Sequence, residues 1–312
     1  MRLSNHRTLK LFGCLLLSLI ITSVAYSDTV LEMHALFGGT NIYAPTVILD
    51  GATYKMWYGG WQVPATQDKI YYRTSPNNSN WSAPTTVLVP SQIGPSVLHV
   101  NDPSVTKHFN ETNGQWQYTM FFTVCMLPCE QQDNQIWSST SSNGINWAHH
   151  QPLLNDAVGS AEPSAIIEPG GVGFWKVYYV DRLDATKVKM IRVDGNRNKV
   201  SEPQVVYQHS GGAISGVEVR QIGGSWHLFF NAFFIDKVDI YKTESASNEL
   251  WPSTFSILIE NSGPTFCGTL TPGVLPASDV QYDLYYGLTP RSADGSCNLT
   301  HQQSIQRWRF AL

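Results

Sequence analysis

Short runs of aromatic and β-branched residues alternate with turn-forming clusters along the chain, without an apolar pattern of helical period. Five runs rich in Trp, Tyr and Phe begin at Tyr54, Trp116, Trp175, Trp226 and Tyr282. Each is followed by a β-branched or aromatic run, beginning at Ile70, Ile136, Val188, Val238 and Ile305. Runs of this length, bounded by Gly, Asn and Ser, are typical of strands. The pattern predicts an all-β protein.

These runs belong to a unit that recurs five times. Each unit opens with a short strand, in four cases at a proline, and the residues before the proline or its equivalent are Ala44, Asp102, Glu162, Gly216 and Thr271. These positions are 54 to 60 residues apart, so five units fill residues 28–312. A fourth, weaker strand follows in the first four units, after turn clusters such as Ser142-Asn143-Gly144.

Four antiparallel strands per unit predict a β-propeller blade, which buries both of its faces only between neighbouring blades. We therefore expect a single five-bladed β-propeller domain over residues 28–312. The last unit lacks a clear fourth strand, and the early segment Val30–Phe37 could supply it and close the ring. A two-sheet sandwich is the alternative, but it would not produce five similar units.

The first 27 residues have the layout of a secretory signal peptide. Arg2, Arg7 and Lys10 precede the apolar stretch Leu11–Ala25, and small residues follow before Asp28. The apolar stretch is too short for a permanent membrane helix, and no later stretch could cross a membrane. We expect a mature protein that begins near Asp28 and is secreted or periplasmic.

Four cysteines remain after the signal peptide, and an even number in an exported chain suggests disulfides. Cys125 and Cys129 would pin one loop, and Cys267 with Cys297 would close another. A zinc site is the alternative, but the chain offers no second close Cys or His pair with the usual spacing.

The low charge of the chain argues against a nucleic acid as its binding partner. Only 14% of the residues are charged, the net charge is −4, and Lys and Arg form no run. A nucleic-acid-binding protein would need such a run, so that class is nearly excluded. We expect a monomer without a metal or cofactor that binds polysaccharide or oligosaccharide, with no membrane partner after signal removal.

Acidic residues mark the inner strands. In a propeller the first strand of each blade lines the central channel, so Asp102 and Glu162 would lie at one mouth, and period 2 would place Glu218 one layer deeper. Two carboxylates in a partly dry funnel have divergent pKa values, which suits acid-base chemistry. The alternative is structural, since acidic residues before proline also form turns.

Loops between the second and third strands open on the same mouth. They carry Trp61, Asp68, Asp181 and Arg182. An indole face stacks on the apolar face of a sugar ring, while carboxylates and a guanidinium bind its hydroxyls. We expect these four residues and Glu218 to contribute to substrate binding.

Several short motifs resemble those of five-bladed glycoside hydrolases. They are the segments 101–105 (NDPSV), 161–164 (AEPS) and 141–147 (SSNGINW). The chain is similar to the arabinanase and β-xylosidase type, glycoside hydrolase family 43, and to the related invertase and levansucrase type. The family 43 resemblance implies an Asp general base on the first inner strand, a tuning and orienting Asp on the second, and a Glu general acid on the third. Asp102 and Glu162 match the last two, whereas Ala44 stands where the base is expected.

Three interpretations of Ala44 stay open. The base could come from Asp68 or Glu218. Alternatively, phosphate could act as nucleophile in a phosphorolytic reaction, for which Arg182 and Arg220 would be the available cations. Finally, the propeller could bind glycans or proteins without catalysis. The sequence favours an exported glycoside hydrolase, with non-catalytic carbohydrate binding as the alternative.

Overall fold

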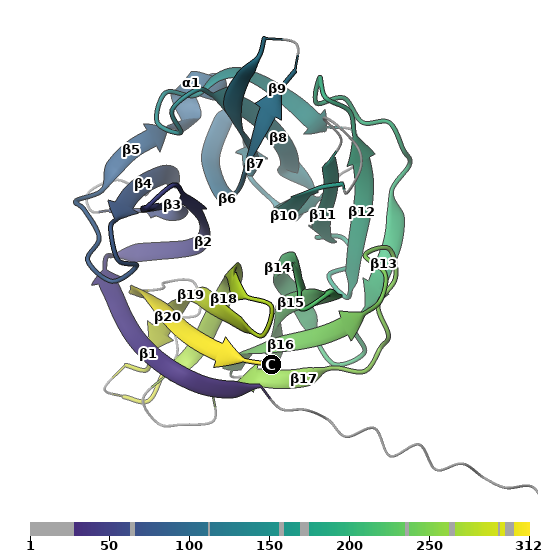
Figure 1. Ribbon diagram of the computed structural model, residues 1–312. Helices are drawn as coiled ribbons and strands as arrows, with labels where there is room; N and C mark the ends of the chain where they lie inside the picture. The colour runs from purple at the N-terminus through teal and green to yellow at the C-terminus, as the bar shows by residue number, and fades with distance from the viewer. Residues whose placement is uncertain are drawn as a thin grey trace, which may run out of the picture.

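The computed structural model describes residues 28–62, 66–111, 113–155, 159–168, 175–234, 237–261, 266–292, 294–296 and 303–312. The predicted signal peptide lies outside these ranges. Within them, the strands form five blades of antiparallel strands arranged in a ring (Figure 1), which confirms the predicted propeller, and a single parallel bridge between Val238 and Gly268 links the fourth blade to the fifth. The described helices are α1 (Pro90–Ile93) and a 3-10 turn at Gln131–Asp133, and neither could cross a membrane.

Each blade runs outward from an inner strand in chain order. The first contains β2 (Asn41–Asp50), β3 (Thr53–Trp61), β4 (Lys69–Ser75) and β5 (Thr85–Leu88). The second contains β6 (Val97–Asn110), β7 (Gln115–Met126), β8 (Asn134–Ser141) and β9 (Ala148–Leu154). The third contains β10 (Ser160–Ile167), β11 (Trp175–Asp181), β12 (Lys187–Val193) and β13 (Gln204–Gln208). The fourth contains β14 (Ala213–Ile222), β15 (Ser225–Phe234), β16 (Lys237–Ser245) and β17 (Ser256–Ile259).

The fifth blade combines the two ends of the described chain. Its inner strand is β18 (Phe266–Ser278), followed outward by β19 (Gln281–Pro290), β20 (Ser304–Ala311) and, as the outermost strand, β1 (Thr29–Gly38). β1 pairs antiparallel with β20 along its whole length, which confirms the predicted closure. Ring closure is reinforced by Asp28, whose buried carboxylate accepts hydrogen bonds from Lys242 of the fourth blade and Tyr282 of the fifth.

A β-bulge interrupts every inner strand at the repeated position. The register with the second strand shifts there in all five blades. The residue at each bulge has a positive φ: 50° for Ala44, 49° for Asp102, 57° for Glu162, 117° for Gly216 and 51° for Thr271. A bulge of this kind re-aims the side chain that it carries. The five equivalent positions predicted from the sequence therefore share a positive φ, which the residue types at these positions did not predict.

One layer deeper, side chains connect each inner strand to the next blade. In four blades a side-chain oxygen accepts a hydrogen bond from a backbone N–H of the following inner strand. The pairs are Thr46 with Val105 at 3.5 Å, Ser104 with Ala165 at 2.9 Å, Ser164 with Val219 at 3.0 Å and Glu218 with Val274 at 3.5 Å. At the fifth position Gly273 lies directly against the Pro45 carbonyl of the first blade.

Turns between the third and fourth strands form contacts in the outer part of the ring. Trp57 in the first blade donates its indole N–H to the Gly144 carbonyl of the second, at 2.7 Å. Tyr178 in the third blade donates its hydroxyl to the Asn248 carbonyl of the fourth, at 2.7 Å. The turn at 141–147 therefore has a structural role, since it holds the second blade to the first. The aromatic strands supply the buried core between blades, including Trp57, Tyr178, Phe230 and Tyr282.

One of the two predicted disulfides is present. Cys125 and Cys129 are bonded at the end of β7, where they close a short loop. The predicted Cys267–Cys297 bond lies outside the described residues, because neither Cys297 nor the side chain of Cys267 belongs to the part of the chain that the structure describes.

Replacing Gly273 by Ala tests the contact that closes the inner ring. A Cβ at Gly273 would lie 1.8 Å from the Pro45 carbonyl oxygen, so the two blades would have to separate. We expect Gly273→Ala to lower the free energy of unfolding by about 3 kcal/mol, the upper part of the range for overpacking. Urea unfolding measures it, with Gly94→Ala as control, since a Cβ at Gly94 meets nothing within 4 Å. Equal midpoints for the two variants would contradict the inferred role of Gly273.

Candidate functional site

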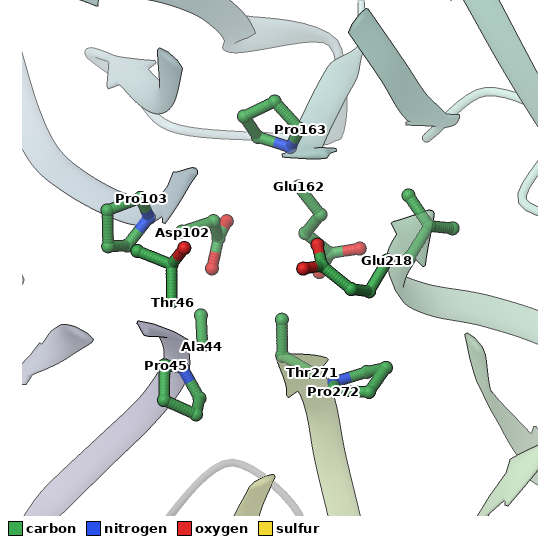
Figure 2. Close-up of a pocket in the computed structure, with 11 residues that line it drawn as sticks. Ala44, Pro45, Thr46, Asp102, Pro103, Glu162, Pro163, Glu218, Thr271 and Pro272 are labelled. Carbon is green, nitrogen blue, oxygen red and sulfur yellow. The ribbon is translucent and has the colours of Figure 1, made fainter. Parts of the chain in front are cut away.

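Acidic side chains from neighbouring blades converge at the neck of the central channel. Figure 2 shows the carboxylates of Asp102, Glu162 and Glu218 directed toward one space, with Ala44 and Thr271 on its other side. The three acidic residues are at most 6% exposed. The free space between them is about 10 Å³, room for roughly one water molecule. A sugar ring is much larger, so it would have to lie above this neck, at the mouth.

Glu162 is held through one of its two carboxylate oxygens. Its Oε1 accepts from the Arg182 guanidinium at 2.6 Å and from the Ser215 hydroxyl at 3.2 Å, and the Gly216 backbone N–H also donates to this carboxylate. Its backbone N–H donates to the Thr123 hydroxyl oxygen at 2.8 Å, which supports the bulge. Its Oε2 is buried and has no hydrogen-bond partner among the described residues. The side chain is therefore oriented, with one oxygen left for another group.

Asp102 has weaker compensation for its burial. The Thr123 hydroxyl hydrogen-bonds its carboxylate, and Arg182 is close enough to favour its charge. Burial and the neighbouring Glu162 outweigh these effects and raise the pKa of Asp102 to about 8. Burial also raises the pKa of Glu162, against the opposing effect of Arg182, Ser215 and the Gly216 N–H. Two adjacent buried carboxyls with raised pKa values retain a proton near neutral pH, which general acid catalysis requires.

Glu218 lies one layer deeper, as predicted, and both of its oxygens are engaged. Its Oε1 forms an ion pair with Arg220 at 2.5 Å and faces the Val274 N–H, and its Oε2 accepts from Ser164 at 2.8 Å. Arg220 also donates to backbone carbonyls below the neck, including that of Val274 at 3.2 Å. Arg220 therefore does not join Arg182 at the mouth, so the two do not form a phosphate clamp.

Asp181 and Arg182 form one turn after β11. The Asp181 Oδ1 accepts from the Leu183 and Asp184 N–H groups at 3.1 and 3.3 Å, and its Oδ2 pairs with Lys189 at 2.7 Å. Its carboxylate therefore stabilises the turn, and the turn directs Arg182 toward Glu162. The Arg182 backbone N–H donates to the Gly159 carbonyl at 2.6 Å, which anchors the turn to the start of the same blade.

Asp68 and Trp61 belong to the first blade, on either side of its mouth loop. Trp61 ends β3, opposite Asn41 in the register, and is partly buried. Asp68 directly precedes β4 and is 13% exposed. Its backbone N–H donates to His99 Nδ1 at 3.0 Å, and its Oδ2 lies 3.2 Å from the same nitrogen. Its side chain also hydrogen-bonds Tyr43, and it is near enough to Asp102 to raise the pKa of that residue.

The structure adds residues that sequence reasoning missed. Thr123 and Ser215 orient the carboxyl pair. Tyr43 and His99 contact Asp68. Asn101 in turn donates to the Tyr43 hydroxyl at 3.0 Å. Tyr43, Asn101 and Ser215 each directly precede one of the five repeated positions. Their place in the repeat could therefore have identified them as neighbours of the site. Thr123 lies in a strand that the sequence predicts only as part of the aromatic core between blades, so nothing in the sequence pointed to it. Among the described residues, no group of three or more His, Cys, Asp or Glu side chains could hold a metal ion.

No protein-family model matches this chain, and no curated protein matches it either. Solved structures match its fold. The catalytic domain of a Coprinopsis cinerea GH62 α-L-arabinofuranosidase superposes with a TM-score of 0.66 at 11% identity, covering 91% of this chain and 98% of that one. A Cellvibrio cellulosa α-L-arabinanase complexed with arabinohexaose gives 0.62 at 12%, covering 86% and 91%. A thermostable family-43 glycoside hydrolase gives 0.65 at 13%, covering 88% and 91%. The chain shares the five-bladed propeller fold of these glycoside hydrolases.

The raised pKa of Asp102 predicts a pH dependence of stability. A carboxyl whose pKa rises on folding binds its proton more tightly in the folded state, so stability decreases as pH rises from about 4 toward 8. Asp102→Asn removes this titration. We expect the wild type to lose about 2 kcal/mol more unfolding free energy than the variant between about pH 6 and pH 8. Urea unfolding at both pH values measures this difference, and parallel losses would contradict a raised pKa.

Proposed function

We propose that this protein is an exported, monomeric glycoside hydrolase that cleaves glycosidic bonds of polysaccharides or oligosaccharides. The observation that carries the proposal is the buried pair Asp102 and Glu162, which retains a proton at the neck of the mouth. Glu162 is the general acid, since its Oε2 has no partner among the described residues and could donate to a leaving-group oxygen. Asp102 tunes and orients it, and Arg182 fixes its other oxygen.

The shared fold supports this proposal, because the structural neighbours named above are glycoside hydrolases. The mouth also has the features of a sugar site. Trp61, which ends β3, would offer an aromatic face there, while Arg182 and Asp68 would offer groups that bind hydroxyls. Phosphorolysis is less favoured, since Arg220 pairs with Glu218 below the neck.

Glu162→Gln tests the assignment of the acid. The amide keeps the size of the side chain and cannot protonate a leaving group, so we expect kcat on polysaccharide substrates to fall about 100- to 10,000-fold. Reducing sugar released from arabinan, xylan and levan measures turnover, and calorimetry measures oligosaccharide binding. Glu111→Gln, in the exposed turn after β6 at the other end of the blade, is the matched control. Unchanged turnover in Glu162→Gln would contradict the assignment.

Non-catalytic carbohydrate binding is the second candidate, and Ala44 favours it. The residue occupies the same bulge as Asp102 and Glu162 but carries no acid. This function predicts saturable oligosaccharide binding without release of reducing ends by the wild type.

Trp61→Ala tests the sugar site itself, under either function. Loss of the stacked indole should weaken oligosaccharide binding by about 1–3 kcal/mol. Calorimetric titration of the variant against the wild type measures this change. Trp116→Ala, which removes an exposed indole at the start of β7, is the control. Equal affinities for Trp61→Ala and the wild type would place the sugar away from this rim.

A further inference from the structure

A hydrolase of this design needs a second carboxylate that activates water, and Ala44 cannot supply one. We propose that Asp68 is this general base, displaced from the inner strand to the mouth loop of the same blade. The inference rests on the proposed function and adds to it the residue that completes the reaction.

Unpaired oxygens single out Asp68. Among the described residues, two carboxylate oxygens are buried without a hydrogen-bond partner, Asp68 Oδ1 and Glu162 Oε2. A buried acceptor without a partner is costly, and such groups mark places where a further group binds. One of these oxygens belongs to the acid already proposed. The other belongs to the side chain next to Tyr43, the residue that precedes Ala44.

Two other acidic residues predicted for the site, Glu218 and Asp181, have both carboxylate oxygens occupied. Both oxygens of Glu218 accept hydrogen bonds or pair with Arg220 below the neck. Those of Asp181 are used by Lys189 and by two N–H groups of its own turn. Asp68 differs from both, since its carboxylate hydrogen-bonds Tyr43 while its Oδ1 has no hydrogen-bond partner among the described residues.

The shape of the neck explains why a base could act from the loop. Its free space holds about one water molecule, so the reacting sugar carbon lies above it, at the level of the mouth loops. Asp68 is in such a loop, on the blade that carries Ala44. A water molecule hydrogen-bonded to Asp68 would then approach the sugar from the first blade, while Glu162 would donate its proton from the third. Attack on the side opposite the leaving group requires such an arrangement.

The reaction balances with these groups and water alone. The water oxygen bonds to the anomeric carbon while its proton passes to Asp68. The bond from that carbon to the leaving oxygen breaks, and Glu162 transfers its proton to this oxygen. Asp68 ends protonated and Glu162 ionised, and exchange with solvent restores both.

Asp68→Asn tests the base, with Asp133→Asn as matched control. Asp133 directly precedes β8 as Asp68 directly precedes β4, but its Oδ2 accepts from the Glu130 N–H in its own turn. We expect Asp68→Asn to lower kcat on aryl glycosides about 100- to 10,000-fold with KM nearly unchanged, while Asp133→Asn retains wild-type values. Thermal unfolding confirms that both variants are folded. A decrease of less than tenfold in kcat overturns the proposal.

Ala44→Asp separates failure of this inference from failure of the proposed function. Asp fits the backbone, because Asp102 has the same φ in the next blade. If Asp68 is the base, the added carboxylate gives no increase in kcat. If the wild type is inactive and Ala44→Asp is active, the chain lacks a base and Asp68 is not one. Inactivity of both proteins on all substrates overturns the hydrolase function and this inference with it.

Discussion

A β-bulge with a left-handed residue is built into every inner strand, and the position of the acidic groups depends on it. A non-glycine residue in this conformation costs about 1–2 kcal/mol, and four of the five bulge positions carry one. Neighbouring blades offset part of this cost, because Thr123 accepts from the Glu162 N–H and Asn231 from the Thr271 N–H. The ring of hydrogen bonds one layer below fixes the blades against one another. The fold thus holds acidic side chains in the channel that an ordinary strand would direct elsewhere.

Holding Asp102 and Glu162 together has a direct electrostatic consequence. Neither carboxyl can lose its proton as easily as it would in water, because both are buried and the charge of Glu162 opposes the ionisation of Asp102. Arg182 compensates one of them through a bond to a single oxygen. The arrangement keeps a proton in the pair and leaves Glu162 Oε2 available. The buried pair lowers the stability of the fold, and it retains the proton that acid catalysis would need.

The fivefold repeat was readable from the sequence because each blade repeats the same order of strands and prolines. The acidic layers followed, since period 2 places Glu218 beneath the ring of Asp102 and Glu162. The bulge was not readable, because Ala44, Asp102, Glu162 and Thr271 share no residue type that demands a positive φ. The partners of the pair were also hidden. Thr123 contacts Asp102 and Glu162 from another strand, and such contacts depend on register shifts that periodicity cannot predict.

Charge repulsion also offers a reason for alanine at the first bulge. An aspartate there would place a further carboxylate beside two buried carboxyls, in a neck with room for about one water molecule. Asp68 avoids this crowding, because it directly precedes β4, outside the residues that line the neck, and its carboxylate hydrogen-bonds Tyr43. Separating the base from the acid in this way would leave room above the neck for the sugar and the attacking water between the two side chains.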